Sequence, residues 1–564
     1  MEMEKKNLAI IILAVALAAS GIGNILFAVL GGFIEVTEPE ELPTTLIFGT
    51  GSGPLDADPQ YLWDSASFDF AFQIWEGLYI YNFTDPSLEI IPGLATDFGT
   101  WVGNNHTVTL KQGITFHSGY RFNATSVKFT FDRLNYLCNF SGDQGETDTI
   151  YGETAISVLY MWPDGTPVLN RTEIISEYQV KFVLNRPFGV WIPLLTFTGS
   201  MMLDPTVTPA DDYICDGMSG ATSETISGTG PFKFDYYVAG VEARYSRNDD
   251  YRLGPAEIEA VVFSVITDPD ARNTAMLNGD VHLLDAPAPG YYDLFRAESK
   301  LTFFEAGSNT ITQYLGMNNV LYNNWTRYAI SYAVDYDYFI TNIMEGEASR
   351  LKSPIPNGIA YANDSFDAPT FNLTKAREYM VAQGYGDMGW TDTQWRQSSF
   401  ITMNYTYNTD NPVRVAFSDQ IIDNLDRIGI VVEDNPLEWG DYKVYLYGLG
   451  VAGYMRLSLW FIGWMPDYND PSNFVNSLMS NVSSSNTAQI NDHLLETYME
   501  MGLSETDPVA REKIYDDLQK YTVEVLRPWV YMYTALNKDV WVDALHGYPS
   551  NPMGYNYFYP CYFE

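Results

Sequence analysis

The segment Val108–Leu134, VTLKQGITFHSGYRFNATSVKFTFDRL, decides the fold class because its hydrophobic period changes partway along. Its first part alternates polar and apolar residues, which predicts a strand, a turn and a second strand. Its second part repeats apolar residues at helical spacing, and Thr125 or Ser126 can cap that predicted helix. Strand and helix patterns alternate in this way from Leu46 onward, so the sequence predicts an α/β or α+β protein.

A second segment, Ala260–Gly279, carries a complete strand-to-helix signal. The run AVVFSVI predicts a buried strand. Asp268 and Pro269 then predict a helix start, as capping residue and first-turn proline, and Gly279 predicts its end.

Length and charge exclude several classes of protein. A chain of 564 residues is too long for a single hydrophobic core, so two or three lobes are expected. The net charge of −40 would repel phosphates, which argues against nucleic-acid binding. The sequence has no phosphate-binding Gly-rich loop, no Gly-x-Ser-x-Gly and no His-Glu-x-x-His, and its five His and three Cys are scattered. We therefore expect no enzyme, no cofactor and no metal cluster, although paired carboxylates of the glycosidase kind stay open.

The N-terminus predicts a membrane anchor. Lys5 and Lys6 precede the uncharged run Leu8–Ile34, which as a helix would rise about 40 Å, more than the roughly 30 Å of a bilayer core. Acidic residues follow the run. An orientation with the two lysines in the cytoplasm and the rest of the chain outside the cell therefore satisfies the positive-inside rule. A cleaved signal peptide is the alternative, and both interpretations place the rest of the chain outside the cell.

An extracellular location gives meaning to two further patterns. Of the three cysteines, Cys138 and Cys215 are the candidate pair for a disulfide, with Cys561 left over. Ten Asn-x-Ser/Thr sequons are candidate N-glycosylation sites: Asn82, Asn105, Asn123, Asn139, Asn170, Asn324, Asn363, Asn372, Asn404 and Asn481.

Several segments, in order along residues 46–560, resemble the large substrate-binding proteins of ABC importers, family 5, the oligopeptide, dipeptide and nickel-binding group. Residues 55–82 are similar to the family's opening motif, a turn and a helix ending in Glu-Gly-Leu. The segment Val108–Leu134 looks like the family signature of a hairpin followed by a helix. Residues 327–340 resemble the helix that opens the second lobe, and residues 463–488 resemble the family's ligand loop.

The resemblance implies an α/β, two-lobed periplasmic-binding-protein-like fold of the large cluster C type, with an extra inserted subdomain and a hinged interlobe cleft. It also implies a peptide or other small solute as ligand and an ABC transporter permease with its ATPase as partners. The expected division is anchor or signal 1–35, linker 36–45, lobe I 46–85, inserted subdomain 86–210, lobe I 211–306, lobe II 307–535 and lobe I 536–564.

The stretch Gly463–Phe474, GWMPDYNDPSNF, is where the resemblance places the ligand. In oligopeptide binders the matching Asp pairs with the α-ammonium of the peptide, and here that residue is Asp467. A carboxylate in an apolar cleft needs such an incoming cation if the protein supplies none. Trp464 would form a flat wall, and Tyr468 and Asn469 would add polar contacts. Asp470 is expected to be structural, in a turn or helix cap.

One position departs from the family pattern. A basic residue that can hold the ligand's carboxylate is replaced by Phe461, and Arg456 or Arg350 are candidate substitutes. Longer peptides, peptides with amidated or blocked ends, and non-peptide ligands therefore stay open. Oligosaccharides are one such ligand, because clefts rich in Trp and Tyr also suit sugars, whereas metal chelates are less expected because the matched loop has no His. A surface receptor without transport is a further alternative.

Overall fold

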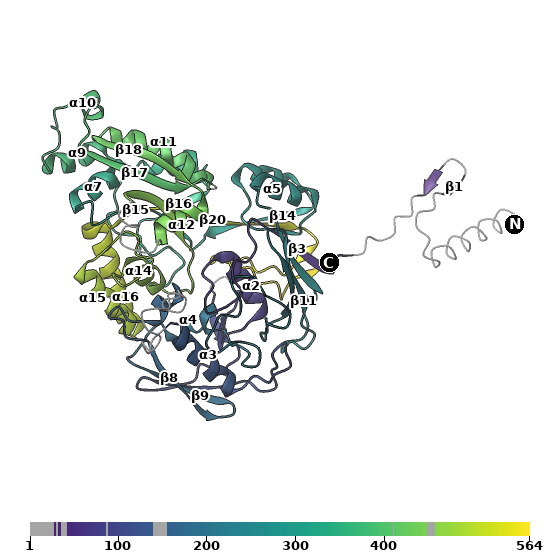
Figure 1. Ribbon diagram of the computed structural model, residues 1–564. Coiled ribbons are helices and arrows are strands. Elements are labelled where there is room, and N and C mark those ends of the chain that lie inside the picture. Colours follow the sequence, from purple (N-terminus) through teal and green to yellow (C-terminus); the bar gives the residue numbers. More distant parts are fainter. Residues whose placement is uncertain are drawn as a thin grey trace. The chain divides into compact units, whose positions relative to one another are not determined.

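The computed structural model contains two compact units, Met1–Pro43 and Thr44–Glu564 (Figure 1). In the small unit only two strands are described, β1 (Phe27–Val29) and β2 (Gly32–Ile34), which pair antiparallel. The end of the predicted helical anchor is thus a hairpin, since aromatic and β-branched residues favour strands and Gly disfavours helix. The rest of the predicted anchor lies outside the described residues, which otherwise comprise 42–85, 88–138, 155–409, 411–447 and 457–564.

No helix within those ranges is both long and apolar enough to cross a membrane.

One half of the large unit, purple and teal in Figure 1, is built on a mixed sheet and is called lobe I here. Its central strand β3 (Thr45–Thr50) runs parallel to β12 (Ala260–Val265) on one side and to β13 (Leu283–Leu284) on the other. Strands β11 (Glu242–Arg247) and β10 (Phe232–Val238) extend the sheet antiparallel.

The predicted strand and helix of segment 260–279 are confirmed. Helix α5 (Pro269–Asn278) follows β12, and the Asp268 carboxylate accepts the backbone N–H of Ala271 at 2.8 Å. Gly279 ends the helix in the left-handed conformation, at φ +77°, which a residue without Cβ adopts at little cost.

The inserted part of lobe I holds a four-stranded antiparallel sheet in the order β6 (Thr100–Val102), β7 (Asn105–Thr109), β9 (Gln179–Leu184) and β8 (Leu169–Ser176). Helix α3 (Ala124–Leu137) packs on β8 and β9.

Two expectations for the segment Val108–Leu134 were wrong in detail. The capping residue of α3 is Asn123, whose Oδ1 accepts from the Thr125 backbone N–H at 2.8 Å, because Thr125 and Ser126 already lie inside the helix. The predicted second strand does not form. The backbone N–H of Phe116 instead bonds to the Tyr120 carbonyl, and that of His117 to Gly228, so the segment closes as a loop against lobe I.

The predicted Cys138–Cys215 disulfide is not formed. Cys215 has a free thiol whose Sγ donates to the Gly217 carbonyl at 3.1 Å. Cys138, directly after the last residue of α3, is buried.

The other half, green in Figure 1, is lobe II. Its sheet runs β18 (Ile430–Leu437), β17 (Ile401–Asn408), β19 (Leu459–Trp464) and β15 (Thr312–Met317), with β17 parallel to both β18 and β19. Two separate apolar clusters lie on the two sides of this sheet. Helices of the first cluster are α7 (Asn324–Ala333), α9 (Leu373–Ala382) and α11 (Pro412–Asp426), and those of the second are α14 (Ser472–Met479), α15 (His493–Ser504) and α16 (Pro508–Lys520).

Strand β20 (Trp529–Val542) joins the two lobes (Figure 1). Its first part pairs with β15 and with β16 (Ala348–Arg350), and its second part with β13 and with β14 (Leu301–Ser308). The partner of β20 changes between Ala535 and Leu536. The chain thus passes between the lobes twice, once between β14 and β15 and once within β20. In hinged proteins a few residues in such connections can change conformation and allow one lobe to rotate against the other.

Candidate ligand-binding site

The candidate site lies at one edge of the lobe II sheet. The parallel strands β17, β18 and β19 all end there, and ligands of open α/β sheets bind outside such carboxyl ends. Helix α11 begins shortly after β17, helix α12 (Trp439–Tyr447) shortly after β18, and the loop 465–471 follows β19. This loop carries the residues that the sequence analysis proposed as ligand contacts.

Asp467 is buried and has no cationic partner. Its side chain is 3% exposed, and its Oδ2 accepts one hydrogen bond, from Asn473 Nδ2 at 2.6 Å. Among the described residues no Lys, Arg or His forms an ion pair with it. Burial raises the pKa of Asp467 to about 7, against the lowering effect of the Asn473 hydrogen bond. At neutral pH the carboxylate is therefore poorly stabilised by the protein itself.

Asn473 connects Asp467 to Trp464. Its Oδ1 accepts from the Asp467 backbone N–H at 3.0 Å and from Trp464 Nε1 at 3.0 Å. The start of α14 thus fixes the orientation of both side chains. The Trp464 ring meets the ring of Trp63 from lobe I edge-on, with centroids 5.9 Å apart.

The other two predicted contacts have mainly structural surroundings. Tyr468 is buried within the apolar cluster of lobe I, and its hydroxyl lies 3.3 Å from Ser472 Oγ. The backbone N–H of Asn469 donates to the Tyr81 hydroxyl at 2.7 Å, which ties the loop to lobe I. The Asn469 side-chain oxygen is buried without a hydrogen-bond partner among the described residues.

Asp470 differs from Asp467 because it has a cation. Arg511 of α16 binds it in a bidentate ion pair, Nη1 to Oδ2 at 2.7 Å and Nη2 to Oδ1 at 2.9 Å. Its Oδ1 also accepts the Ser472 backbone N–H at 2.9 Å. Asp470 is structural, as expected. Its partner Arg511 could not be predicted from the local sequence, because it lies 41 residues later in the chain.

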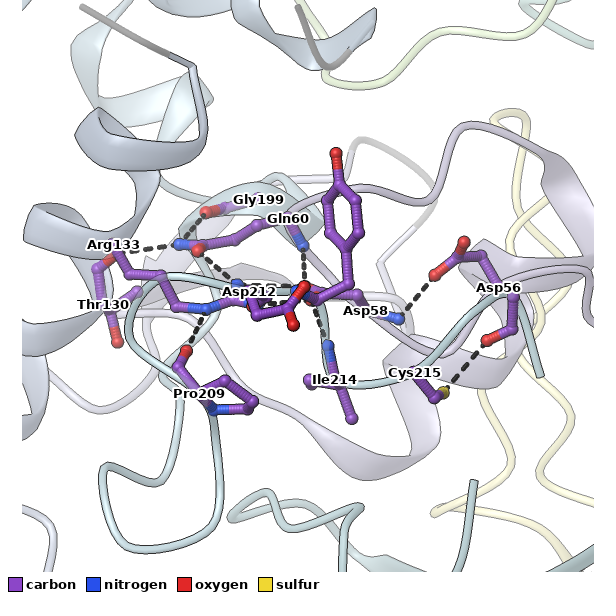
Figure 2. Close-up of polar contacts among 12 residues, drawn as sticks. Asp56, Asp58, Gln60, Thr130, Arg133, Gly199, Pro209, Asp212, Ile214 and Cys215 are labelled. Carbon is purple, nitrogen blue, oxygen red and sulfur yellow. Dashed lines mark hydrogen bonds and ion pairs between the residues drawn. The ribbon is translucent and has the colours of Figure 1, made fainter. Parts of the chain in front are cut away.

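Lobe I contributes Trp63, and a buried network holds the segment before it (Figure 2). Arg133 binds both carboxylate oxygens of Asp58 and donates to Gln60 Oε1 at 2.8 Å and to the Pro209 carbonyl at 2.6 Å. Asp58 and Arg133 are both fully or almost fully buried, so this pair fixes the path of the chain toward Trp63.

The sequence analysis missed Arg414, which lies in the first turn of α11 at the same sheet edge. It is 6% exposed, and its guanidinium donates to Asn408 Oδ1 at 2.5 Å and to Gln313 Oε1 at 3.3 Å. Its Nε is buried with no acceptor among the described residues. The guanidinium also lies over the ring of Phe461, 5.9 Å from the centroid.

Arg414 therefore lies beside the position where the family's basic residue is missing. The sequence does indicate that Arg414 stands at a helix start, because NPVR follows a predicted buried strand. It does not indicate that this helix start lies beside Phe461, which depends on the pairing of β17 with β19. Of the two substitutes proposed from sequence, Arg456 is outside the described residues, and Arg350 lies over the Tyr336 ring, as described below.

The sequons stay candidate glycosylation sites. Asn139 is outside the described residues, and Asn82, Asn105, Asn123, Asn363 and Asn404 are half-buried. The exposed ones, to which a glycan has the easiest access, are Asn170, Asn324, Asn372 and Asn481.

Two lobes joined by a crossing strand, with an unneutralised buried carboxylate where they meet, define the class of two-lobed solute-binding proteins. The sequence model of the bacterial extracellular solute-binding proteins, family 5, matches residues 89–486. The chain therefore belongs to that family, as the resemblance in the sequence implied.

Individual relatives and structures agree with this assignment. Heme-binding protein A of Haemophilus influenzae is 24% identical over 538 residues, 91% of each chain. Di/tripeptide-binding protein 2 of Pseudomonas aeruginosa is 25% identical over 530 residues, 91% of this chain and 93% of its own. The ABC transporter-associated periplasmic binding protein DppA from Helicobacter pylori, in complex with peptide STSA, has a TM-score of 0.78 at 22% identity, covering 92% of this chain and 98% of its own. The two-lobed fold class is confirmed by this comparison.

Proposed function

We propose that this protein binds short peptides with a free amino terminus and delivers them to an ABC transporter permease without chemically changing them. The observation that carries the proposal is Asp467, a buried carboxylate with no cation of its own among the described residues. The relatives include proteins named for di- and tripeptides, and the H. pylori structure holds a peptide.

The ammonium group of a peptide supplies the missing charge. Burying a lone carboxylate costs several kcal/mol unless it is protonated or paired, and the raised pKa of Asp467 expresses that cost. An incoming ammonium both neutralises the carboxylate and fills its remaining acceptor positions. The neighbouring rings of Trp464 and Trp63 are flat apolar walls for the peptide backbone or first side chain.

Arg414 is the partner we assign to the peptide carboxylate. It is buried at the same sheet edge, it has an unpaired Nε, and neither of its two polar contacts is a carboxylate. A guanidinium can bind a carboxylate with two parallel hydrogen bonds. Asp467 and Arg414 would then select zwitterionic peptides, with one charged group for each end.

Calorimetric titration with one short peptide in four forms tests this assignment: free, N-acetylated, C-amidated and doubly blocked. We expect each block to lower affinity by about tenfold or more, since each removes a charged hydrogen bond worth roughly 1.5–3 kcal/mol. Native mass spectrometry of protein purified without unfolding would first fix the peptide length.

The variant Arg414→Gln assigns the carboxylate end. It should lose about tenfold in affinity for the C-free peptide and nothing for the C-amidated one. Arg121→Gln, at an exposed arginine of lobe I, is the matched control and should bind all forms like wild type. Equal binding of free and blocked peptides, or binding of an oligosaccharide or metal chelate instead, would contradict the proposal.

We also propose that the N-terminus tethers the protein outside the cell. The part of the uncharged run before β1, Leu8–Leu26, would as a helix span about 28 Å, close to a bilayer core of roughly 30 Å. Fractionation of full-length and N-terminally truncated protein separates a retained anchor from a cleaved signal.

A further inference from the structure

A small cavity lies inside lobe II, between the start of β20, the strand β16 and the π-helical segment η5 (Tyr521–Leu526) that follows α16. Its volume is about 10 Å³, the room that one water-sized particle needs. Its lining includes the three cationic residues Arg350, Lys352 and Arg527, and no acidic residue.

Arg527 is the most buried of the three cations, at 6% exposure. It ends η5 in the left-handed conformation, at φ +45°, which a residue with a Cβ adopts only when its surroundings hold it there. Its Nε donates to the Val523 carbonyl at 3.0 Å, while its Nη1 is buried with no acceptor.

Arg350 is oriented by two neutral groups. Its guanidinium carbon lies 3.7 Å from the centroid of the Tyr336 ring, and its Nη2 donates to the Pro369 carbonyl. Its Nε, like Nη1 of Arg527, is buried without an acceptor. Two guanidinium groups on one small cavity thus each keep an unused N–H donor.

The charge around this cavity is unusual for this chain. The sequence has 71 Asp and Glu for 31 Lys and Arg, so a cation can find an acidic partner easily. Yet none of Arg350, Lys352 and Arg527 forms an ion pair with any described residue. The acids nearest in sequence have other partners: Glu524 accepts the Asp367 backbone N–H at 3.4 Å, and Glu347 pairs with Lys538.

We propose that this cavity binds one small inorganic anion of the size of chloride. An unsatisfied buried donor destabilises the fold, and more so when it is charged. A water molecule would accept hydrogen bonds from these donors but would not balance their charge. A monatomic anion does both, and a cavity of about 10 Å³ has no room for phosphate or sulfate. Such an anion would bridge η5 to β16 and the N-terminal end of β20.

Thermal unfolding in sodium chloride and sodium gluconate at one constant ionic strength tests the proposal. We expect chloride to raise Tm in a saturable way, by roughly 1–3 °C, because a ligand that binds only the folded state stabilises it. Bromide should act like chloride. Arg350→Gln and Arg527→Gln should lose this halide-dependent rise, and Lys300→Gln, at an exposed lysine, should keep it.

Line broadening of the ³⁵Cl NMR signal by the wild-type protein gives a readout that does not depend on whether the Arg527 variant folds. Broadening that Arg350→Gln reduces supports the site. Equal Tm in chloride and gluconate without broadening would mean that only water fills the cavity. Saturable stabilisation by phosphate but not by halide would overturn the assignment to a monatomic anion.

Discussion

Asp467 and Asp470 lie three residues apart in one loop, equally buried, yet the protein treats their charges in opposite ways. Arg511 neutralises Asp470 with two hydrogen bonds, whereas Asp467 receives only the neutral amide of Asn473. The first pair holds α14 to α16. The Asp467 carboxylate forms no ion pair with any described residue. Equal burial therefore accompanies two different electrostatic situations, and only the partner of each carboxylate separates them.

The largest expected effect comes from breaking the paired acid. Arg511→Met should destabilise the fold by about 3–5 kcal/mol, because it leaves the Asp470 carboxylate buried and unpaired. Denaturant unfolding measures the change. The double variant Asp470→Asn/Arg511→Met should recover much of the loss, and a fully additive double variant would contradict the coupling.

Removing the charge of the unpaired acid should affect binding rather than stability. At neutral pH Asp467→Asn should raise the unfolding free energy, since it removes a buried charge without a partner. Affinity for a peptide with a free amino terminus should fall by about 10–100-fold. The N-acetylated peptide is the control, and its affinity should be the same for variant and wild type. Strong destabilisation of the variant would show that the Asp467 charge is structural.

The pH dependence of binding should show the same loss of charge in smaller steps. Because burial raises the pKa of Asp467 to about 7, the carboxylate that pairs with an ammonium is lost as pH falls through 7. Affinity for the free-amine peptide should drop by about tenfold per pH unit between pH 6 and 4, and this slope should be absent in Asp467→Asn. A flat wild-type profile over this range would argue against an ionised Asp467 in the complex.

The stability of the ligand-free protein should change in the opposite direction. The pKa of Asp467 is higher in the folded state than the ordinary value of 3.8, so the folded state binds the proton more tightly. This carboxyl therefore destabilises the fold as pH rises through about 4 to 7 and favours it at the lower end. The wild-type and Asp467→Asn unfolding free energies should accordingly converge toward pH 4.

The sequence predicted an element correctly where that element is fixed by contacts between residues close together in the chain. Asp268, Pro269 and Gly279 set both ends of α5 by contacts within a few residues. The second strand predicted after Gly113 is replaced by a loop, in which Phe116 bonds locally to Tyr120 and His117 bonds to Gly228, more than a hundred residues away. The number of cysteines and the expected extracellular location likewise suggested a Cys138–Cys215 disulfide, but the structure forms no bond between these two residues.

The sequence by itself determined the family, the alternation of strands and helices, and the loop in which an acid next to Trp464 stands out. Only the tertiary structure decided which acid is neutralised, because Arg511 reaches Asp470 across 41 residues. It also decided that Arg414 lies over Phe461. The physical reason is that charge pairing depends on distance in space, and the parallel order of β17 and β19 sets that distance independently of position along the chain.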